Sequence, residues 1–144
     1  MLVYSPYKGP GKKACPQLMR AGPPRYTLAR RVTIRECDIN NGKSSGLAIV
    51  GGDRESAVLV IDTKIHSNTV TSSDAGVHVQ TNFAGNATFL RCELFDNRPT
   101  LGDWLSRGGG MRVAGAVEAF IHMEDCDIHH NEATSGGAGI ILRR

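Results

Sequence analysis

The order of apolar and polar positions along the chain repeats four times between Val32 and Leu142. Each copy begins with two apolar residues spaced by two and continues with a small residue, an apolar residue, an Asn and a Gly. Two more apolar residues at alternate positions end the copy. Alternation over three to six residues, interrupted by Asn and Gly, is typical of short strands and not of helices. Each copy therefore predicts three short β-strands.

The four copies align on the small residue, at intervals of 26, 29 and 34 residues. Repeats of this size indicate a solenoid, in which each strand pairs with the equivalent strand of the next coil. The small-residue column contains Cys37, Thr63, Cys92 and Cys126. The Asn column contains Asn41, Asn68, Asn97 and Asn131. We therefore predict an all-β, single-stranded parallel β-helix of about four coils.

Both columns have a physical reason in such a fold. Asn tolerates the left-handed backbone region, and Asn amides stacked at one position per coil can bond each other along the axis. The step from Ile34 to Cys37 is three residues, which reverses the facing of the side chains unless the chain turns a corner there. Small side chains would fill that corner. Cys92 and Cys126 fall in adjacent coils, where a disulfide is sterically feasible, but reduced thiols would pack equally well.

The chain divides into two parts. Residues 1–31 contain five of the six prolines and seven basic residues without an acidic one, and their apolar residues show no period. This composition predicts a disordered or loosely draped N-terminal segment, with the repeats forming one domain over residues 32–144. The net charge of the chain, +3, is mild, and much of it belongs to this segment. We interpret the basic residues as a solvated tail and expect no nucleic-acid partner.

No apolar run approaches the roughly 20 residues that span a bilayer, so we expect no membrane span. The first residues lack the apolar core of a signal peptide, because Ser5, Pro6 and Lys8 follow Met1–Tyr4 closely. The localisation stays open between two alternatives. The protein is extracellular or at the cell surface if the chain is a piece of a secreted protein, and intracellular otherwise.

The repeats resemble those of right-handed parallel β-helix proteins of the pectate-lyase-like class. The apolar-x-x-Asn steps, as in Leu94–Asn97, and Gly136-Gly137-Ala138 are also similar to motifs of polymorphic outer-membrane proteins, which are adhesins. There the first position is Phe, whereas this chain has Ile or Leu. The resemblance covers residues 32–144 and implies a right-handed coil. It also implies carbohydrate binding or cleavage, or adhesion, as candidate functions.

The longest predicted loop, residues 98–108, is the first candidate for a binding site. It contains the only Trp of the chain, Trp104, with Arg98 and Arg107, and it leads to the strand of Arg112. His78 occupies the same outward column one coil earlier. Together these side chains could stack on a sugar ring and bind its hydroxyl or anionic groups. Alternatively, Trp104 covers apolar side chains of its own loop.

Two functions follow from these observations. The first is a non-catalytic scaffold or binding module for carbohydrate or protein surfaces, which we favour because no catalytic cluster is evident. The alternative is a polysaccharide lyase or hydrolase, with Arg112 as base or anion clamp, His78 as acid/base, and Asp74 or Asp103 as partner. The outward charges near the Cys column alternate in sign along the axis, which predicts cross-strand ion pairs rather than paired catalytic carboxylates.

We expect no metal and no cofactor. His66 and His129 share a column but lie two coils apart, about 10 Å, which is too far for ligands of one ion. Possible partners are a polysaccharide, another protein, or a second copy of the chain stacked end to end. The last expectation arises because the final coil would leave apolar residues and strand edges uncovered. The alternative on the same observation is that the chain is a fragment of a longer β-helix.

Overall fold

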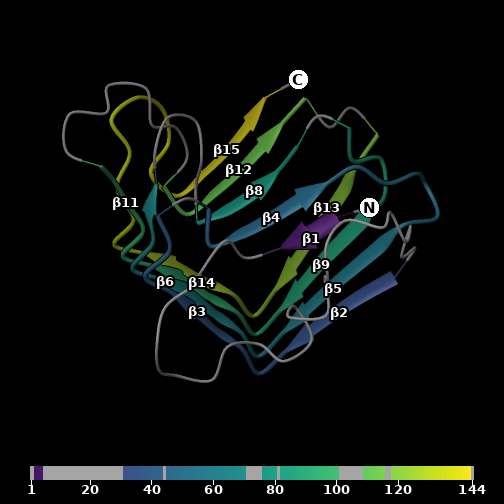
Figure 1. Cartoon of the computed structure of the whole chain (residues 1–144), viewed down its shortest axis with the longest axis horizontal. Coiled ribbons are helices and arrows are strands. Elements are labelled where there is room, and N and C mark those ends of the chain that lie inside the picture. Colours follow the sequence, from purple (N-terminus) through teal and green to yellow (C-terminus); the bar gives the residue numbers. More distant parts are fainter. Residues whose placement is uncertain are drawn as a thin grey trace.

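The structure, a computed structural model, describes residues 2–4, 31–43, 45–70, 76–80, 82–100, 109–115 and 118–143. Every strand of the four repeats pairs in parallel with the equivalent strand of the neighbouring coil (Figure 1). The predicted parallel β-helix of four coils is therefore confirmed.

Three sheets run along the axis of the coil, as the three predicted strands per repeat require. The first sheet contains β2 (Arg31–Arg35), β5 (Ala57–Ile61), β9 (Asn86–Leu90) and β13 (Phe120–Glu124). The second contains β3 (Asp38–Asn40), β6 (Lys64–His66), β10 (Glu93–Phe95) and β14 (Asp127–His129). The third contains β1 (Leu2–Tyr4), β4 (Leu47–Val50), β8 (Val77–Val79), β12 (Met111–Ala114) and β15 (Ile140–Arg143). A fourth, two-stranded sheet contains β7 (Thr69–Val70) and β11 (Arg98–Pro99).

The core consists of columns of inward side chains, one from each coil. The register of the strands places Ile34 opposite Val60, and Val60 opposite Phe89. All three side chains are fully buried. In the third sheet, Leu47, Val77 and Met111 form an equivalent buried column. Apolar side chains stacked in this way remove one another from water, which is the main driving force for the fold.

The corners between the sheets are made by residues with a left-handed backbone. One such residue precedes each member of the small-residue column, and a second lies five positions later. These residues are Glu36, Asp62, Arg91 and Asp125 at the first corner, and Asn41, Ser67, Asp96 and His130 at the second. Their φ angles lie between 49° and 55°. The first corner explains the odd step of three residues before each Cys or Thr.

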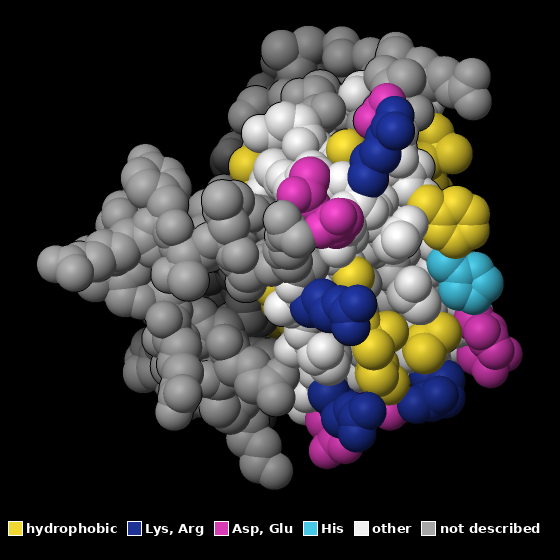
Figure 2. All heavy atoms as spheres, turned by 90° about the vertical axis from the view of Figure 1, so that its right-hand side faces the viewer, with side chains coloured by type: hydrophobic (Ala, Val, Ile, Leu, Met, Phe, Trp, Pro, Cys, Tyr) yellow, Lys and Arg dark blue, Asp and Glu magenta, His cyan; other side chains and the backbone are white. Residues whose placement is uncertain are grey.

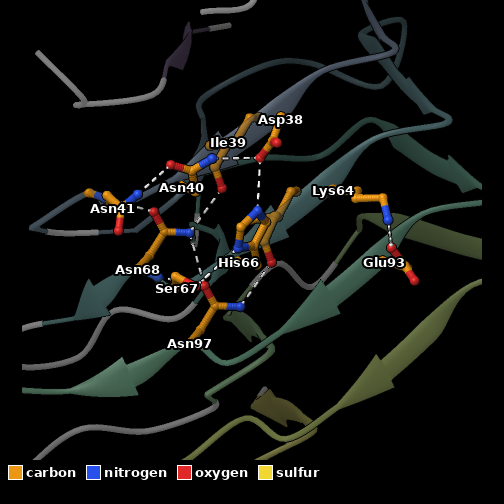
Figure 3. A network of polar contacts seen from close by, with 12 residues as sticks. Asp38, Ile39, Asn40, Asn41, Lys64, His66, Ser67, Asn68, Glu93 and Asn97 are labelled. Atoms are coloured by element: carbon orange, nitrogen blue, oxygen red, sulfur yellow. Dashed lines mark hydrogen bonds and ion pairs between the residues drawn. The ribbon is translucent and has the colours of Figure 1, made fainter. Parts of the chain in front are cut away.

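The Asn side chains stack inside the second corner (Figure 3). Asn68 donates from Nδ2 to Oδ1 of Asn97 over 2.9 Å, and Asn97 donates in the same way to Asn131 over 2.9 Å. Asn68 is also an acceptor for the backbone N–H of Gly42. Gly42 therefore occupies the ladder position of the first coil, and the assignment of Asn41 to this ladder was wrong.

The physical reason lies in the corner itself. The left-handed residue of the corner directly precedes each ladder Asn, and Asn41 is that left-handed residue in the first coil, with φ 55°. Its side chain is exposed and donates to the neighbouring Asn40. The tolerance of Asn for left-handed backbone thus applies to Asn41 alone, whereas Asn68, Asn97 and Asn131 act through their amides.

The small-residue column lines the first corner and is not chemically uniform. Thr63 donates its hydroxyl to the carbonyl of Ile61 over 2.8 Å. Cys92 and Cys126 are free thiols, so no bridge joins these adjacent coils, whereas Cys37 forms a disulfide. Burial raises the pKa of the Cys92 thiol to about 11. The buried Cys92 is therefore a packed, protonated side chain and not a reactive thiolate.

The two ends of the β-helix differ. At the N-terminal end, β1 pairs antiparallel with β4, with Val3 opposite Ile49. This strand was not anticipated from residues 1–31, of which residue 1 and residues 5–30 lie outside the described residues. At the C-terminal end, Ile140 and Leu142 are 44% and 71% exposed. The core is therefore open at its last coil. Within the described ranges, no helix has the length and apolar character needed to cross a bilayer.

Candidate functional site

The outward row of the third sheet, which was predicted to carry a site, contains Ala48, His78, Arg112 and Ile141. The first two of these residues are buried. His78 and Arg112 are direct partners across β8 and β12, as expected. The His78 side chain is only 8% exposed, however, and Ala48 next to it in the row is 3% exposed. A side chain buried to this extent does not present its ring to a polymeric substrate in solution.

Four of the predicted site residues lie outside the described residues: Asp74, Asp103, Trp104 and Arg107. The predicted ledge that combined Trp104 with the arginines therefore stays a prediction. Of the ligand-binding residues predicted from the sequence, Arg98, Arg112 and His78 are described.

The outward charges near the first corner pair with one another across neighbouring coils. Arg91 donates to both carboxylate oxygens of Asp62, over 2.7 and 2.8 Å, which holds the pKa of Asp62 below its ordinary value. The ammonium group of Lys64 contacts Glu93, as Figure 3 shows. These ion pairs agree with the alternating charges of the sequence. Asp62 and Glu93 are thus each neutralised by a basic side chain.

Asp38 is held in a further polar cluster on the same surface (Figure 3). Partial burial by itself raises the pKa of Asp38, but hydrogen bonds from Asn40 and His66 outweigh it and leave the pKa below its ordinary value. The distance from Nε2 of His66 to Oδ1 of Asp38 is 2.8 Å. Asp38 is therefore a fixed carboxylate rather than a proton donor.

An open pocket lies where the second corner leads into β7 and β11. It has a volume of about 260 Å³ and is lined by Ser67, Asn68, Thr69, Asp96 and Arg98. All five side chains are polar, and they come from two neighbouring coils. Among the predicted site residues, Arg98 alone lies here.

The repeat itself positions these side chains. The left-handed corner turns Ser67 and Asp96 away from the Asn ladder, while the next residue in each coil is a ladder Asn. Thr69 and Arg98 then pair directly across β7 and β11. Equivalent positions of adjacent coils thus stack into a small surface with two hydroxyls, a carboxylate and a guanidinium group.

Arg98 is the central charge of the pocket. Its guanidinium lies 3.6 Å from Asp96 and 3.4 Å from Glu132. All three side chains are more than 40% exposed, so these contacts are weak and can be exchanged for bonds to a ligand. Asn68 differs, because its amide already bonds Asn97 and the carbonyl of Ile39. The hydroxyl of Ser67 lies 3.0 Å from Nδ1 of His66 but has capacity for further hydrogen bonds. Ser67, Thr69, Asp96 and Arg98 are therefore the groups available for binding.

A column of rings directly precedes the left-handed residues of the second corner. His66 stacks on Phe95 at a centroid distance of 4.5 Å, and Phe95 stacks on His129 at 5.2 Å. The rings are within 8° of parallel and follow one another along the axis. Each ring therefore covers the face of its neighbour. Phe95 is covered on both faces, whereas the two end rings, His66 and His129, each have one face that no ring of the stack covers.

The histidines of this surface do not make an evident metal site. His66 and His129 are separated by Phe95, as the sequence suggested. His129 and His130 approach through their Nδ1 atoms at 2.6 Å. Among the described residues, no group of three His, Cys, Asp or Glu side chains could hold a metal ion.

The surface charges of the described part are mixed. Figure 2 shows basic and acidic side chains next to each other on one face, with hydrophobic side chains between them. On that face no extended area of a single charge is visible, and the charged surface is of the kind expected for a chain with a net charge of +3.

Comparison with protein families identifies the class of this chain. The model of the family described as "Right handed beta helix region" matches residues 25–144, which is most of the chain. The protein therefore belongs to the right-handed β-helix family. Neither the curated proteins nor the solved structures contain a match.

The sequence analysis missed three residues of the pocket: Ser67, Thr69 and Asp96. The signal that could have found them is their position on either side of the ladder Asn. The residue before it occupies a left-handed corner and the residue after it starts a short strand, so both are set apart from the inward Asn. Assigning the Asn of the first repeat one residue too early concealed this relation.

Proposed function

We propose that the chain is a non-catalytic binding module that takes a carbohydrate at the corner pocket. The observation that supports this best is the composition of the pocket, in which two hydroxyls, an exposed carboxylate and an exposed guanidinium converge. On the second sheet, by contrast, Lys64 contacts Glu93 and Asp38 contacts His66. The pocket thus has the groups that are able to exchange weak internal contacts for a ligand.

The chemistry of a sugar matches these groups. A sugar hydroxyl both donates and accepts, so it can donate to Asp96 while accepting from Arg98. Ser67 and Thr69 offer hydroxyls of the same dual character. Ligand pockets for larger molecules usually measure about 300–1,000 Å³. The volume of about 260 Å³ therefore suits one sugar unit of a longer chain that continues over the open surface.

The same groups are poorly arranged for glycoside cleavage. That reaction requires one carboxyl group that keeps its proton and a second, ionised carboxylate. Asp96 and Glu132 both face the positive charge of Arg98 and are 42% and 59% exposed. Both carboxylates contact the same guanidinium group, an arrangement that fits ligand binding better than cleavage.

The test is a binding measurement with defined oligosaccharides, both neutral and uronate-containing, followed by NMR on the labelled chain. We expect shifts at the pocket residues, loss of binding in Arg98→Gln and weaker binding in Asp96→Asn. Arg54→Gln is the matched control, because Arg54 is an exposed arginine that pairs with Glu118 outside the pocket. Failure of every glycan to bind, or binding unaffected by Arg98→Gln, overturns the proposal. Product release that is lost in Arg112→Ala instead supports the lyase or hydrolase.

A further inference from the structure

The chain contains a single Asn-Gly pair, Asn41-Gly42, and this pair lies at the second corner of the first coil. The Asn41 side chain is exposed, whereas Gly42 is buried. In such a pair the backbone nitrogen of the glycine can attack the side-chain carbonyl carbon of the asparagine, since glycine has no Cβ atom to obstruct the approach. Asn41 is therefore open to a covalent modification that needs no enzyme.

The reaction needs only water as a co-reactant. The N–H of Gly42 loses its proton to hydroxide, and the nitrogen forms a bond to Cγ of Asn41. The bond from Cγ to Nδ2 breaks, and the departing amide takes up a proton from water and leaves as ammonia. Water then opens the cyclic imide at either of its carbonyl groups. The products are aspartate and isoaspartate, and in isoaspartate the backbone runs through Cβ and Cγ and is therefore longer by one carbon.

The N–H that has to react is already bonded in the folded chain. Gly42 donates it to Oδ1 of Asn68 over 3.0 Å, in the interior of the second corner. Asn68 is itself fixed, because its backbone N–H and its Nδ2 both donate to Oδ1 of Asn97, over 3.2 and 2.9 Å. We propose that Asn41 is a site of isoaspartate formation, and that the Asn ladder controls the reaction by occupying the N–H of Gly42.

A second contact ties Gly42 to the following coil. Its carbonyl accepts from the backbone N–H of Thr69 over 2.8 Å. Gly42 therefore bonds the second coil through both of its backbone groups, and its nitrogen becomes free only when the first coil separates locally from the second. Local openings of this kind occur in folded proteins, and hydrogen exchange reports how often they occur. The rate of modification at Asn41 is thus set by this opening.

The Asn41 side chain belongs to the polar cluster on the surface of this corner (Figure 3). Its Nδ2 donates to Oδ1 of Asn40 over 2.6 Å, and Nδ2 of Asn40 donates to Oδ1 of Asp38 over 2.6 Å. Both products replace the donating amide by a carboxylate, which cannot donate to Asn40 and adds a negative charge to the cluster of Asp38. In isoaspartate, the longer backbone also displaces Gly42 relative to Asn68. The modified first coil therefore cannot restore its original contacts.

The asparagines of the ladder are protected in a different way. Asn68 and Asn97 are buried, and Nδ2 of each donates to a carbonyl of the preceding coil. They are followed by Thr69 and Arg98, whose side chains obstruct the approach of the backbone nitrogen. In the first coil, Gly42 takes the ladder position, and this places an exposed asparagine directly before a glycine.

The test incubates the full chain at mildly alkaline pH, beside a synthetic peptide with the sequence of residues 38–45, and follows Asn41 by mass spectrometry of proteolytic fragments. The peptide has no ladder acceptor, so we expect the chain to be modified at least about tenfold more slowly. The factor of slowing should match the hydrogen-exchange protection of the Gly42 N–H within about threefold, also when urea below the unfolding transition raises both rates. A chain modified as fast as the peptide, or at a rate unrelated to exchange at Gly42, overturns the proposal.

Asn68→Ala removes the acceptor and should speed the modification of Asn41 at least about tenfold. Asn68→Asp is the matched variant, because its carboxylate still accepts from Gly42, and it should react more slowly than Asn68→Ala. Asn86, an exposed asparagine followed by alanine, is the internal control and should stay intact while Asn41 reacts. If Asn68→Ala does not fold, the comparison with hydrogen exchange in the unaltered chain decides. Equal rates in the folded Asn68→Ala variant and the unaltered chain overturn the proposal, as does an Asn41 that stays intact in the peptide.

Discussion

The carboxamide nitrogen of Asn97 lies 2.6 Å from the point that a Cβ atom of Gly76 would occupy. The two residues belong to successive coils, and Gly46 and Asn68 are related in the same way. Gly and Asn therefore recur together because one provides the space that the other fills. This relation links the repeat pattern of the sequence to the packing of the coils.

Gly76→Ala tests this packing directly. The added methyl group would meet the Asn97 amide and, at 2.8 Å, the carbonyl of Gly110, so the coils must separate slightly. We expect the free energy of unfolding to fall by about 1–3 kcal/mol, as for overpacked sites. Urea denaturation measures it. Gly139→Ala is the control, and an equal loss in both variants would contradict the explanation.

Asn97→Ala should be more harmful still. The Asn97 side chain is fully buried and bonds Ile65, Asn68 and Asn131. Alanine would leave buried donors and acceptors without partners, at about 1–3 kcal/mol for each group. We expect a loss of roughly 3 kcal/mol or more, visible as a lower urea midpoint.

Asn41→Gly distinguishes the observed register from the one expected from the sequence. Asn41 is exposed and left-handed, with φ 55°, so glycine should change the stability by less than about 0.5 kcal/mol. A loss comparable to that of Asn97→Ala would place Asn41 in the ladder after all.

Glu36→Gly should stabilise the chain. Glu36 has a left-handed backbone, with φ 52°, which costs a residue with a Cβ atom about 1–2 kcal/mol. Glycine removes this cost but loses more backbone entropy, so we expect a net gain of roughly 0.5–1 kcal/mol. Glu36→Ala keeps the Cβ atom and should show no gain. Identical melting temperatures for the two variants would argue against backbone strain at this corner.

We predict that the buried thiol of Cys92 makes the folded chain less stable at alkaline pH. Its pKa is raised to about 11 in the folded chain by burial, whereas an unfolded thiol has a pKa of about 8.5. Between these values the folded state holds a proton that the unfolded state has released, so the free energy of unfolding decreases as the pH rises. The full effect is about 3 kcal/mol, at roughly 1.4 kcal/mol per pH unit.

Cys92→Thr provides the reference for this measurement, because Thr63 occupies the same column one coil earlier. Denaturation curves of both proteins at pH 7, 9 and 11 should diverge only at the higher values. Parallel pH dependence would mean that Cys92 does not titrate on unfolding.

The register of the core strands could be predicted from the sequence because apolar residues recur at the same position in each coil. Ile34, Val60 and Phe89 align at fixed distances from the small residue, and the strands pair in that register. The corners were also foreseeable, since an odd step between inward residues requires a turn. These features depend on local spacing, which the sequence displays directly.

Other features depend on contacts that spacing does not reveal. β1 pairs with β4 across a long segment, and nothing in Leu2–Tyr4 specifies an antiparallel partner. The burial of His78 could not be read from its outward position, because alternation gives the side of a sheet and not what lies over it. The pocket around Arg98 arises from the stacking of two coils, so no single stretch of sequence encodes it.

The identical contact of Gly with Asn at successive junctions has a consequence for the evolution of such chains. Gly46 meets Asn68 and Gly76 meets Asn97 in the same geometry, although the intervals between the coils are 26, 29 and 34 residues. Whole repeats can therefore be duplicated or deleted by recombination, because the same Gly–Asn contact joins any two successive coils. Differences in repeat length accumulate in the connections, where they disturb neither the spacing of the rungs nor the amides that join them.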